Sequence, residues 1–143
     1  MNFDFSPEQI MLRDQIRRFM KNEIAPLIDQ HEAARTFPLK LLPKLAEFGY
    51  LGGVLPESDG GMGIDYETWS MMFEEAGYCW GSLRTVLNSI NVPLLVLAKT
   101  ANDAQRKRFL EPLLAGEKTV FTALSEPNVG SNLAGVQMRA DLS

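Results

Sequence analysis

Apolar residues recur at helical spacing along most of this chain, and capping residues divide them into separate stretches. The first stretch opens at Ser6, where Pro7 suits the first helical position and Gln9 completes a capping box. Its apolar face comprises Leu12, Ile16, Phe19, Met20, Ile24, Leu27 and Ile28. Pro26 lacks a backbone N–H but does not interrupt this pattern, so we expect the helix to bend there rather than end.

Five further amphipathic stretches follow, over residues 38–48, 65–76, 83–90, 93–98 and 102–115. Pro93 is expected to open the fifth helix, and Asn102 with Gln105 to cap the sixth. The glycine-rich sequence LGGVLPESDGGMG, residues 51–63, predicts a sharply turning loop between the second and third helices. Six helices with short connections predict an all-α bundle over residues 1–117.

The chain changes character after residue 117. The sequence TVFTAL, residues 119–124, is rich in β-branched and aromatic residues and predicts a strand, and the turn-rich sequence SEPNVGSNLAG follows it. A lone strand is unstable because it lacks a ladder partner. We therefore expect two domains: a helical domain over residues 1–117 and the truncated beginning of a β-domain over residues 118–143.

Charge and composition exclude several classes of protein. The formal net charge of −4 argues against nucleic acid as the main partner. The single cysteine excludes an internal disulfide, and the single histidine excludes a His-rich metal centre. The N-terminus lacks the features of a secretory signal, and the apolar run over residues 92–98 is too short to span a bilayer. We expect a soluble, cytoplasmic protein without a bound metal.

Isolated polar and glycine residues offer no catalytic site of their own. The sequence around Gly61 and Gly63 lacks the third glycine and the preceding strand of a dinucleotide-binding fingerprint. Glu74 and Glu75 are adjacent on a helix and point about 100° apart, so we expect a solvated face rather than paired carboxylates. His31 is expected at the surface or as a cap, and Cys79 as a buried, inert thiol.

The sequence SEPNVGSN, residues 125–132, resembles the flavin-binding signature TEPxxGSD of the acyl-CoA dehydrogenase family. Three more stretches are similar to family blocks and occur in the family's order: FSPEQIMLRDQIRRFMKNEIAP, FPLKLLPKLAEFGYLGGVLPESDGGMGID and AQRKRFLEPLLAGEKTVFTALSEP. Together they cover nearly the whole chain. Two positions depart from the signature: Ser125 replaces Thr and keeps the hydroxyl, and Asn132 replaces Asp and loses the charge.

The resemblance implies an N-terminal helical domain followed by the start of a β-barrel. Enzymes of this family take the α-proton of an acyl-CoA thioester and pass the β-hydrogen as hydride to FAD, which leaves a 2-enoyl-CoA. They serve fatty acid or amino acid catabolism, assemble as homodimers or homotetramers, and usually pass electrons to an electron-transfer flavoprotein. The family's catalytic Glu is expected beyond residue 143, so the resemblance predicts that these residues alone are inactive.

The resemblance also assigns site residues. The cofactor-binding residues implied by it are Thr122, Leu124, Ser125, Gly130 and Ser131. Backbone N–H groups and a hydroxyl at Leu124 and Ser125 would stabilise the charge that gathers on the reduced flavin. Ser131 matches the serine that touches both the flavin and the acyl thioester. Gly130 is expected to adopt a positive φ in the tight turn.

Two alternative functions stay open at this stage. Within the same superfamily, the flavin could serve an oxidase or a monooxygenase, which differ in oxygen access and in the base. From another class, the chain could be a stand-alone helical interaction or assembly module that kept the fold without the catalysis. The unpaired strand after residue 117 argues against the second alternative.

Overall fold

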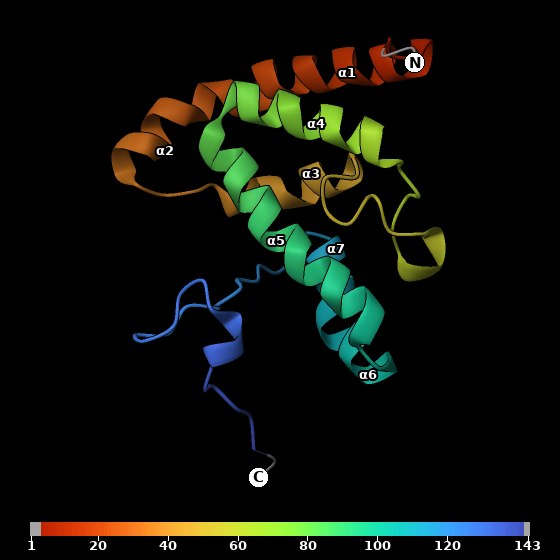
Figure 1. The fold of residues 1–143 in the computed structure, drawn as a ribbon. Helices are drawn as coiled ribbons and strands as arrows, with labels where there is room; N and C mark the ends of the chain where they lie inside the picture. Colours follow the sequence, from red (N-terminus) through yellow and green to blue (C-terminus); the bar gives the residue numbers. More distant parts are fainter. Residues whose placement is uncertain (1–3, 142–143) are drawn as a thin grey trace.

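The computed structural model describes residues 4–141, and these form a helical structure without a strand (Figure 1). The α-helices are α1 (Pro7–Phe19), α2 (Ile28–Ala34), α3 (Leu42–Glu47), α4 (Tyr66–Cys79), α5 (Gly81–Thr100), α6 (Asp103–Gln105) and α7 (Glu111–Leu114). Short π-helical turns occupy Met20–Ile24 and Arg106–Leu110, and 3₁₀ turns occupy Ala25–Leu27, Leu39–Leu41, Glu57–Asp59 and Leu133–Gly135. The predicted all-α class is confirmed.

The first helical segment begins and bends as predicted. The Gln9 N–H donates to Ser6 Oγ at 3.2 Å, and the Ser6 N–H donates to Gln9 Oε1 at 2.8 Å, which completes the capping box. After α1, the chain passes through the π-helical turn Met20–Ile24 and the 3₁₀ turn Ala25–Leu27 before α2. Pro26 lies in this 3₁₀ turn, where its missing N–H and its ring disfavour regular α-helical geometry.

The expected helices over 83–90 and 93–98 are one continuous helix, α5, so the described residues form five helical segments rather than six. Pro93 lies inside α5 instead of opening a new helix. Leu87 and Leu94, on either side of Pro93, are both fully buried. Packing of one continuous apolar stripe therefore outweighs the hydrogen bond that the proline removes.

α5 is also the one helix in the described part of the chain that is long and apolar enough to cross a membrane, judged by length and composition. It lies between α4 and α7 in Figure 1 and contacts both helices. Its buried side chains are Leu83, Leu87, Ile90, Asn91, Leu94 and Ala98. This stripe identifies α5 as the central core helix of the bundle.

A buried amide fixes the glycine-rich loop to α5. Asn91, only 2% exposed, donates from Nδ2 to the carbonyl of Tyr50 at 2.7 Å and to that of Leu87 at 2.8 Å. Its Oδ1 accepts from the Gly52 N–H at 2.7 Å. The buried Tyr50 hydroxyl donates to the carbonyl of Met72 at 2.8 Å, and burial raises the pKa of Tyr50, so the hydroxyl stays protonated. The start of the loop is therefore fixed between α4 and α5.

The end of α7 approaches the start of α3 at a glycine. Gly116 has a φ of +71°, and a Cβ placed there would lie 2.5 Å from the carbonyl carbon of Leu42. Gly63 has a similar φ of +64°, but a Cβ there would meet nothing within 4 Å. Both glycines therefore have a left-handed backbone, but only Gly116 also has no room for a side chain.

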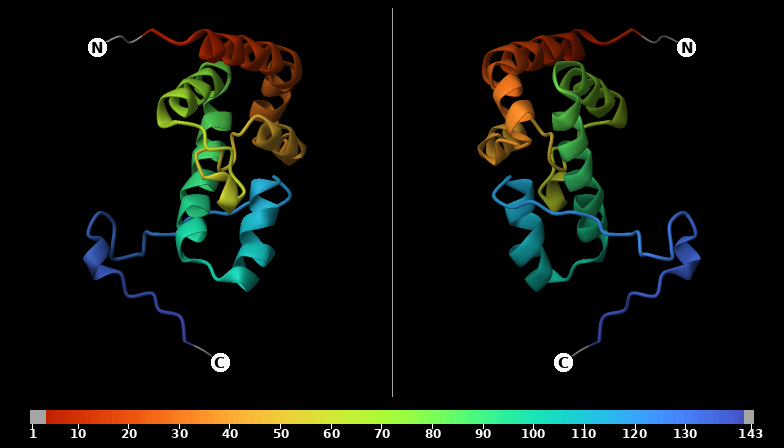
Figure 2. Two further views of the ribbon diagram at one scale, coloured as in Figure 1. Left: turned by 90° about the vertical axis from the view of Figure 1, so that its right-hand side faces the viewer. Right: turned by 90° about the vertical axis from the view of Figure 1, so that its left-hand side faces the viewer.

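The strand predicted over residues 119–124 is absent from the structure. These residues are extended without a ladder partner, and the bridge recorded within residues 4–141 joins Glu126 to Val129. A strand needs a neighbouring strand to accept its hydrogen bonds, and the helical bundle offers none. Figure 2 shows this C-terminal segment leaving the helical body.

We predict that Asn91→Leu lowers the free energy of unfolding by about 2–4 kcal/mol, because the Gly52 N–H and the Tyr50 carbonyl lose their buried partner. Asn88→Leu is the matched control, since Asn88 is exposed on the same helix and its change should stay within about 0.5 kcal/mol. Urea denaturation monitored by circular dichroism measures both. Equal stability of the two variants would contradict the role of Asn91.

We predict that Gly116→Ala is more destabilising than Gly63→Ala by about 1–3 kcal/mol, the usual cost of overpacking. Both variants carry the penalty of about 1 kcal/mol for a left-handed backbone, so their difference isolates the contact with Leu42. Thermal unfolding of the two variants provides the measurement. A difference of zero would mean that α7 and α3 can separate at no cost.

Candidate functional site

The predicted cofactor-binding residues lie on the exposed segment that follows the bundle. Val120 is half-buried and packs against the core, which holds the start of the segment to the helices. Beyond it, all of the predicted residues are exposed: Thr122, Leu124, Ser125, Gly130 and Ser131. The segment therefore presents these residues to solvent rather than to the interior of the bundle.

A tight turn over residues 126–129 brings the two parts of the predicted site together. The Glu126 N–H donates to the Val129 carbonyl at 2.9 Å, and the Val129 N–H donates to the Glu126 carbonyl at 3.1 Å. Ser125 precedes this pair and Gly130 follows it, so Ser125 and Ser131 lie on the two arms of one turn. Thr122 lies farther along the first arm.

Hydrogen-bond donors on both arms are free to meet a ligand. The N–H groups of Leu124 and Ser125 donate to no backbone carbonyl of the described residues. Within the same residues, the hydroxyls of Ser125 and Ser131 have no recorded partner. A ligand with acceptor atoms or developing negative charge can therefore engage these donors without displacing an existing contact.

The expected positive φ at Gly130 is wrong. The glycines with positive φ in the described chain are Gly49, Gly52, Gly60, Gly63 and Gly116. Pro127 and Asn128 take the central positions of the turn, and neither has a positive φ, so the turn closes before Gly130. A Cβ at Gly130 would meet nothing within 4 Å, which leaves this side of the turn open.

Sequence reasoning missed a carboxylate at the base of this turn. Glu126 Oε1 accepts from the Met138 N–H at 2.8 Å, and Oε2 accepts from the Gln137 N–H at 3.0 Å. These contacts join residues 11 and 12 positions apart. No spacing rule within SEPNVGSN points to residue 137, so the motif alone could not reveal them.

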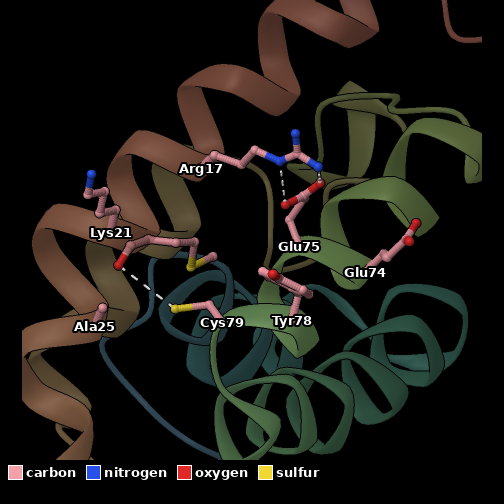
Figure 3. Close-up of a pocket in the computed structure, with 8 residues that line it drawn as sticks. Arg17, Lys21, Ala25, Glu74, Glu75, Tyr78 and Cys79 are labelled. Carbon is pink, nitrogen blue, oxygen red and sulfur yellow. Dashed lines mark hydrogen bonds and ion pairs between the residues drawn. The ribbon is translucent and has the colours of Figure 1, made fainter.

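A groove of about 710 Å³ lies elsewhere, between the first helical segment and α4 (Figure 3). It is lined by Arg17, Met20, Lys21, Ala25, Glu74, Glu75, Tyr78 and Cys79. The guanidinium of Arg17 reaches across it to Glu75, with Nε–Oε2 at 2.9 Å and Nη2–Oε1 at 2.8 Å. This bidentate ion pair joins α1 to α4 and neutralises both charges.

Glu75 corrects an expectation from the sequence. Glu74 is exposed as predicted, but Glu75 is only 7% exposed because it faces Arg17 rather than solvent. Burial raises the pKa of the half-buried Cys79, which keeps it a thiol, and its Sγ lies 3.8 Å from the Met20 carbonyl. The groove thus holds a structural ion pair and a protonated thiol, and it lacks an activated nucleophile among the residues that line it.

The other titratable residues described by the structure offer no metal-binding cluster. His31 Nδ1 lies 2.8 Å from Thr36 Oγ1 at the end of α2, consistent with the expected capping role. Among residues 4–141, no three His, Cys, Asp or Glu side chains gather where they could hold a metal ion. The donors on the two arms that flank the turn over residues 126–129 are therefore the candidate functional site.

Known proteins match the chain over nearly its whole length. The family model for the N-terminal domain of acyl-CoA dehydrogenases matches residues 6–117. A probable acyl-CoA dehydrogenase of Bacillus subtilis is 32% identical over 141 residues, which cover 98% of this chain and 37% of that protein. A subunit of the caffeyl-CoA reductase–Etf complex of Acetobacterium woodii is 32% identical over 141 residues, which cover 95% of this chain and 36% of that protein.

The fold matches solved structures equally well. A glutaryl-CoA dehydrogenase of Mycobacterium smegmatis, solved in complex with FADH2, superimposes with a TM-score of 0.84 at 20% identity, over 92% of this chain and 34% of that chain. The chain thus spans little more than a third of the length of the relatives that it matches. Because the family model covers residues 6–117 and a relative 32% identical aligns with 98% of the chain, the chain belongs to the acyl-CoA dehydrogenase family.

Proposed function

We propose that this chain forms the N-terminal part of an FAD-dependent acyl-CoA dehydrogenase that converts an acyl-CoA thioester to its 2-enoyl-CoA. The observation that carries the proposal is the set of free donors at Leu124, Ser125 and Ser131 on one turn. The names of the matched relatives support the substrate class, and the FADH2 complex of one neighbour supports the cofactor. Residues 1–117 and 118–143 are proposed as separate domains.

The donors on the turn fit a flavin. The pyrimidine edge of a flavin offers acceptor atoms, and bound FAD supplies the electron-pair acceptor for hydride transfer. The N–H groups of Leu124 and Ser125 and the Ser125 hydroxyl would hold this edge of the flavin, and as donors they would stabilise negative charge that develops there more than they stabilise the neutral ground state. The open side at Gly130 lets a planar ligand approach the backbone.

Ser131 has a second role in this proposal. It lies on the arm opposite Ser125, beyond the open position at Gly130. Its hydroxyl can therefore orient the acyl thioester while the first arm holds the cofactor. No Asp or Glu of this chain matches the family's catalytic base, so we propose that these 143 residues alone do not turn over substrate.

The direction of the reaction and the electron partner are part of the proposal. One relative is a subunit of a caffeyl-CoA reductase–Etf complex and is as similar in sequence as the probable dehydrogenase. Reduction of a 2-enoyl-CoA is therefore a second candidate, with an electron-transfer flavoprotein as the partner in either direction. Bleaching of the oxidised flavin by a saturated acyl-CoA under anaerobic conditions would identify the dehydrogenase. Reoxidation of the reduced flavin by a 2-enoyl-CoA, without any bleaching by the saturated acyl-CoA, would identify the reductase.

Ser125→Ala in the flavin-loaded enzyme should slow flavin reduction, because its activation free energy should rise by about 1.5–3 kcal/mol, the value of one hydrogen bond to a charged group. Ser131→Leu should instead raise the substrate KM. Stopped-flow reduction and steady-state kinetics separate the two effects. Thr119→Ala, which removes an exposed hydroxyl earlier in the same segment, is the control. A reduction rate and flavin potential equal to wild type in Ser125→Ala would remove Ser125 from the site.

We further propose that the protein assembles as a homodimer or homotetramer. Val92 and Val96 are 47% and 55% exposed one turn apart on α5, an apolar pair that association can bury. Val92→Ser with Val96→Ser should weaken self-association in sedimentation velocity. Met11→Ser, at a site 59% exposed on α1, is the control and should change nothing. A monomeric wild-type chain at all concentrations would contradict assembly through this surface.

A further inference from the structure

Glu126 is the residue that ties the two ends of the candidate loop together. Both of its carboxylate oxygens are engaged: Oε1 accepts from the Met138 N–H at 2.8 Å, and the Gln137 N–H donates to Oε2 at 3.0 Å and to Oε1 at 3.2 Å. The other hydrogen bonds recorded within residues 119–141 span no more than three positions. Within this segment, the Glu126 side chain alone connects distant positions.

These contacts close a ring of residues 126–138. The ring contains Gly130 and Ser131, and Ser125 is attached to it directly. Without the closure, the exposed segment would be held only by the local turns at residues 126–129 and 131–136. Closing a loop of this length has an entropic cost that charge-assisted hydrogen bonds can offset.

We propose that Glu126 is the positioning residue of the flavin-binding loop, which its carboxylate holds in shape by accepting the amides of Gln137 and Met138. The inference rests on the proposed function, because it gives the closed loop a flavin to bind. Preorganised donors must keep their geometry to stabilise a developing charge. The backbone pair Glu126–Val129 sets the two arms, and the ring restrains the second arm, which carries Ser131, at its far end. Glu126 acts through this geometry and does not itself touch the reacting atoms.

The first experiment needs no flavin. In the 143-residue chain, Glu126→Ala should raise the hydrogen-exchange rates of the Gln137 and Met138 amides about tenfold, because both amides lose their acceptor. Glu126→Gln keeps one acceptor oxygen and should show a smaller increase. Glu117→Gln, at an exposed carboxylate just before the segment, is the control and should leave both rates unchanged. Equal exchange in wild type and Glu126→Ala would overturn the proposal.

The second experiment titrates FAD into the flavin-free protein. The FAD dissociation constant should rise at least about tenfold in Glu126→Ala and less in Glu126→Gln, with Glu117→Gln equal to wild type. An unchanged dissociation constant in Glu126→Ala, with wild type binding FAD, would overturn this inference alone. A wild-type protein that binds no FAD would instead overturn the proposed function, and with it the role of Glu126 in flavin binding.

Discussion

The side-chain amide of Asn91 is the contact on which the arrangement of the helices depends. One donor contact, to the Tyr50 carbonyl, and one acceptor contact, from the Gly52 N–H, hold residues 50–52 against α5, while the second donor contact, to Leu87, stays within the helix. The hydrogen bond from the Tyr50 hydroxyl to the Met72 carbonyl also connects this part of the chain to α4. A buried amide without partners is costly, so the glycine-rich loop is held in the one register that satisfies it. With α4 and α5 fixed, α1 docks on α4 through Arg17–Glu75 and Gln9–Thr68.

Features that depend on neighbouring residues could be predicted from the sequence. The capping boxes at Ser6 and Asn102 and the bend at Pro26 all follow from residues within one or two turns. Pro93 could not be interpreted in this way, because whether a proline ends a helix depends on what its two flanks bury. The burial of Glu75 could not be predicted for the same reason, since its partner Arg17 lies 58 residues away.

In the candidate site, too, features set by adjacent residues could be predicted and features set by distant residues could not. Its residues came from a short motif whose members are adjacent in sequence, and the structure brings Ser125 and Gly130 together across one turn. The conformation of Gly130 and the contacts of Glu126 could not be predicted, because they depend on where residues 127–128 and 137–138 lie. The strand predicted over residues 119–124 is absent for a related reason. β-propensity gives only a local preference, and a strand forms only where a neighbouring strand pairs with it.

Pro93 also leaves one carbonyl of α5 without its helical hydrogen bond. Because a proline has no N–H, the carbonyl of Ser89, four residues earlier, lacks its usual helical donor. At Pro112 the corresponding carbonyl, that of Arg108, accepts from Lys118 Nζ at 3.3 Å. Ser89 lies one turn before the exposed Val92, so water bound at this carbonyl would be displaced by any surface that covers that part of α5. An all-hydrocarbon surface would leave the carbonyl dehydrated, whereas one that offers an N–H or O–H group would replace the lost water.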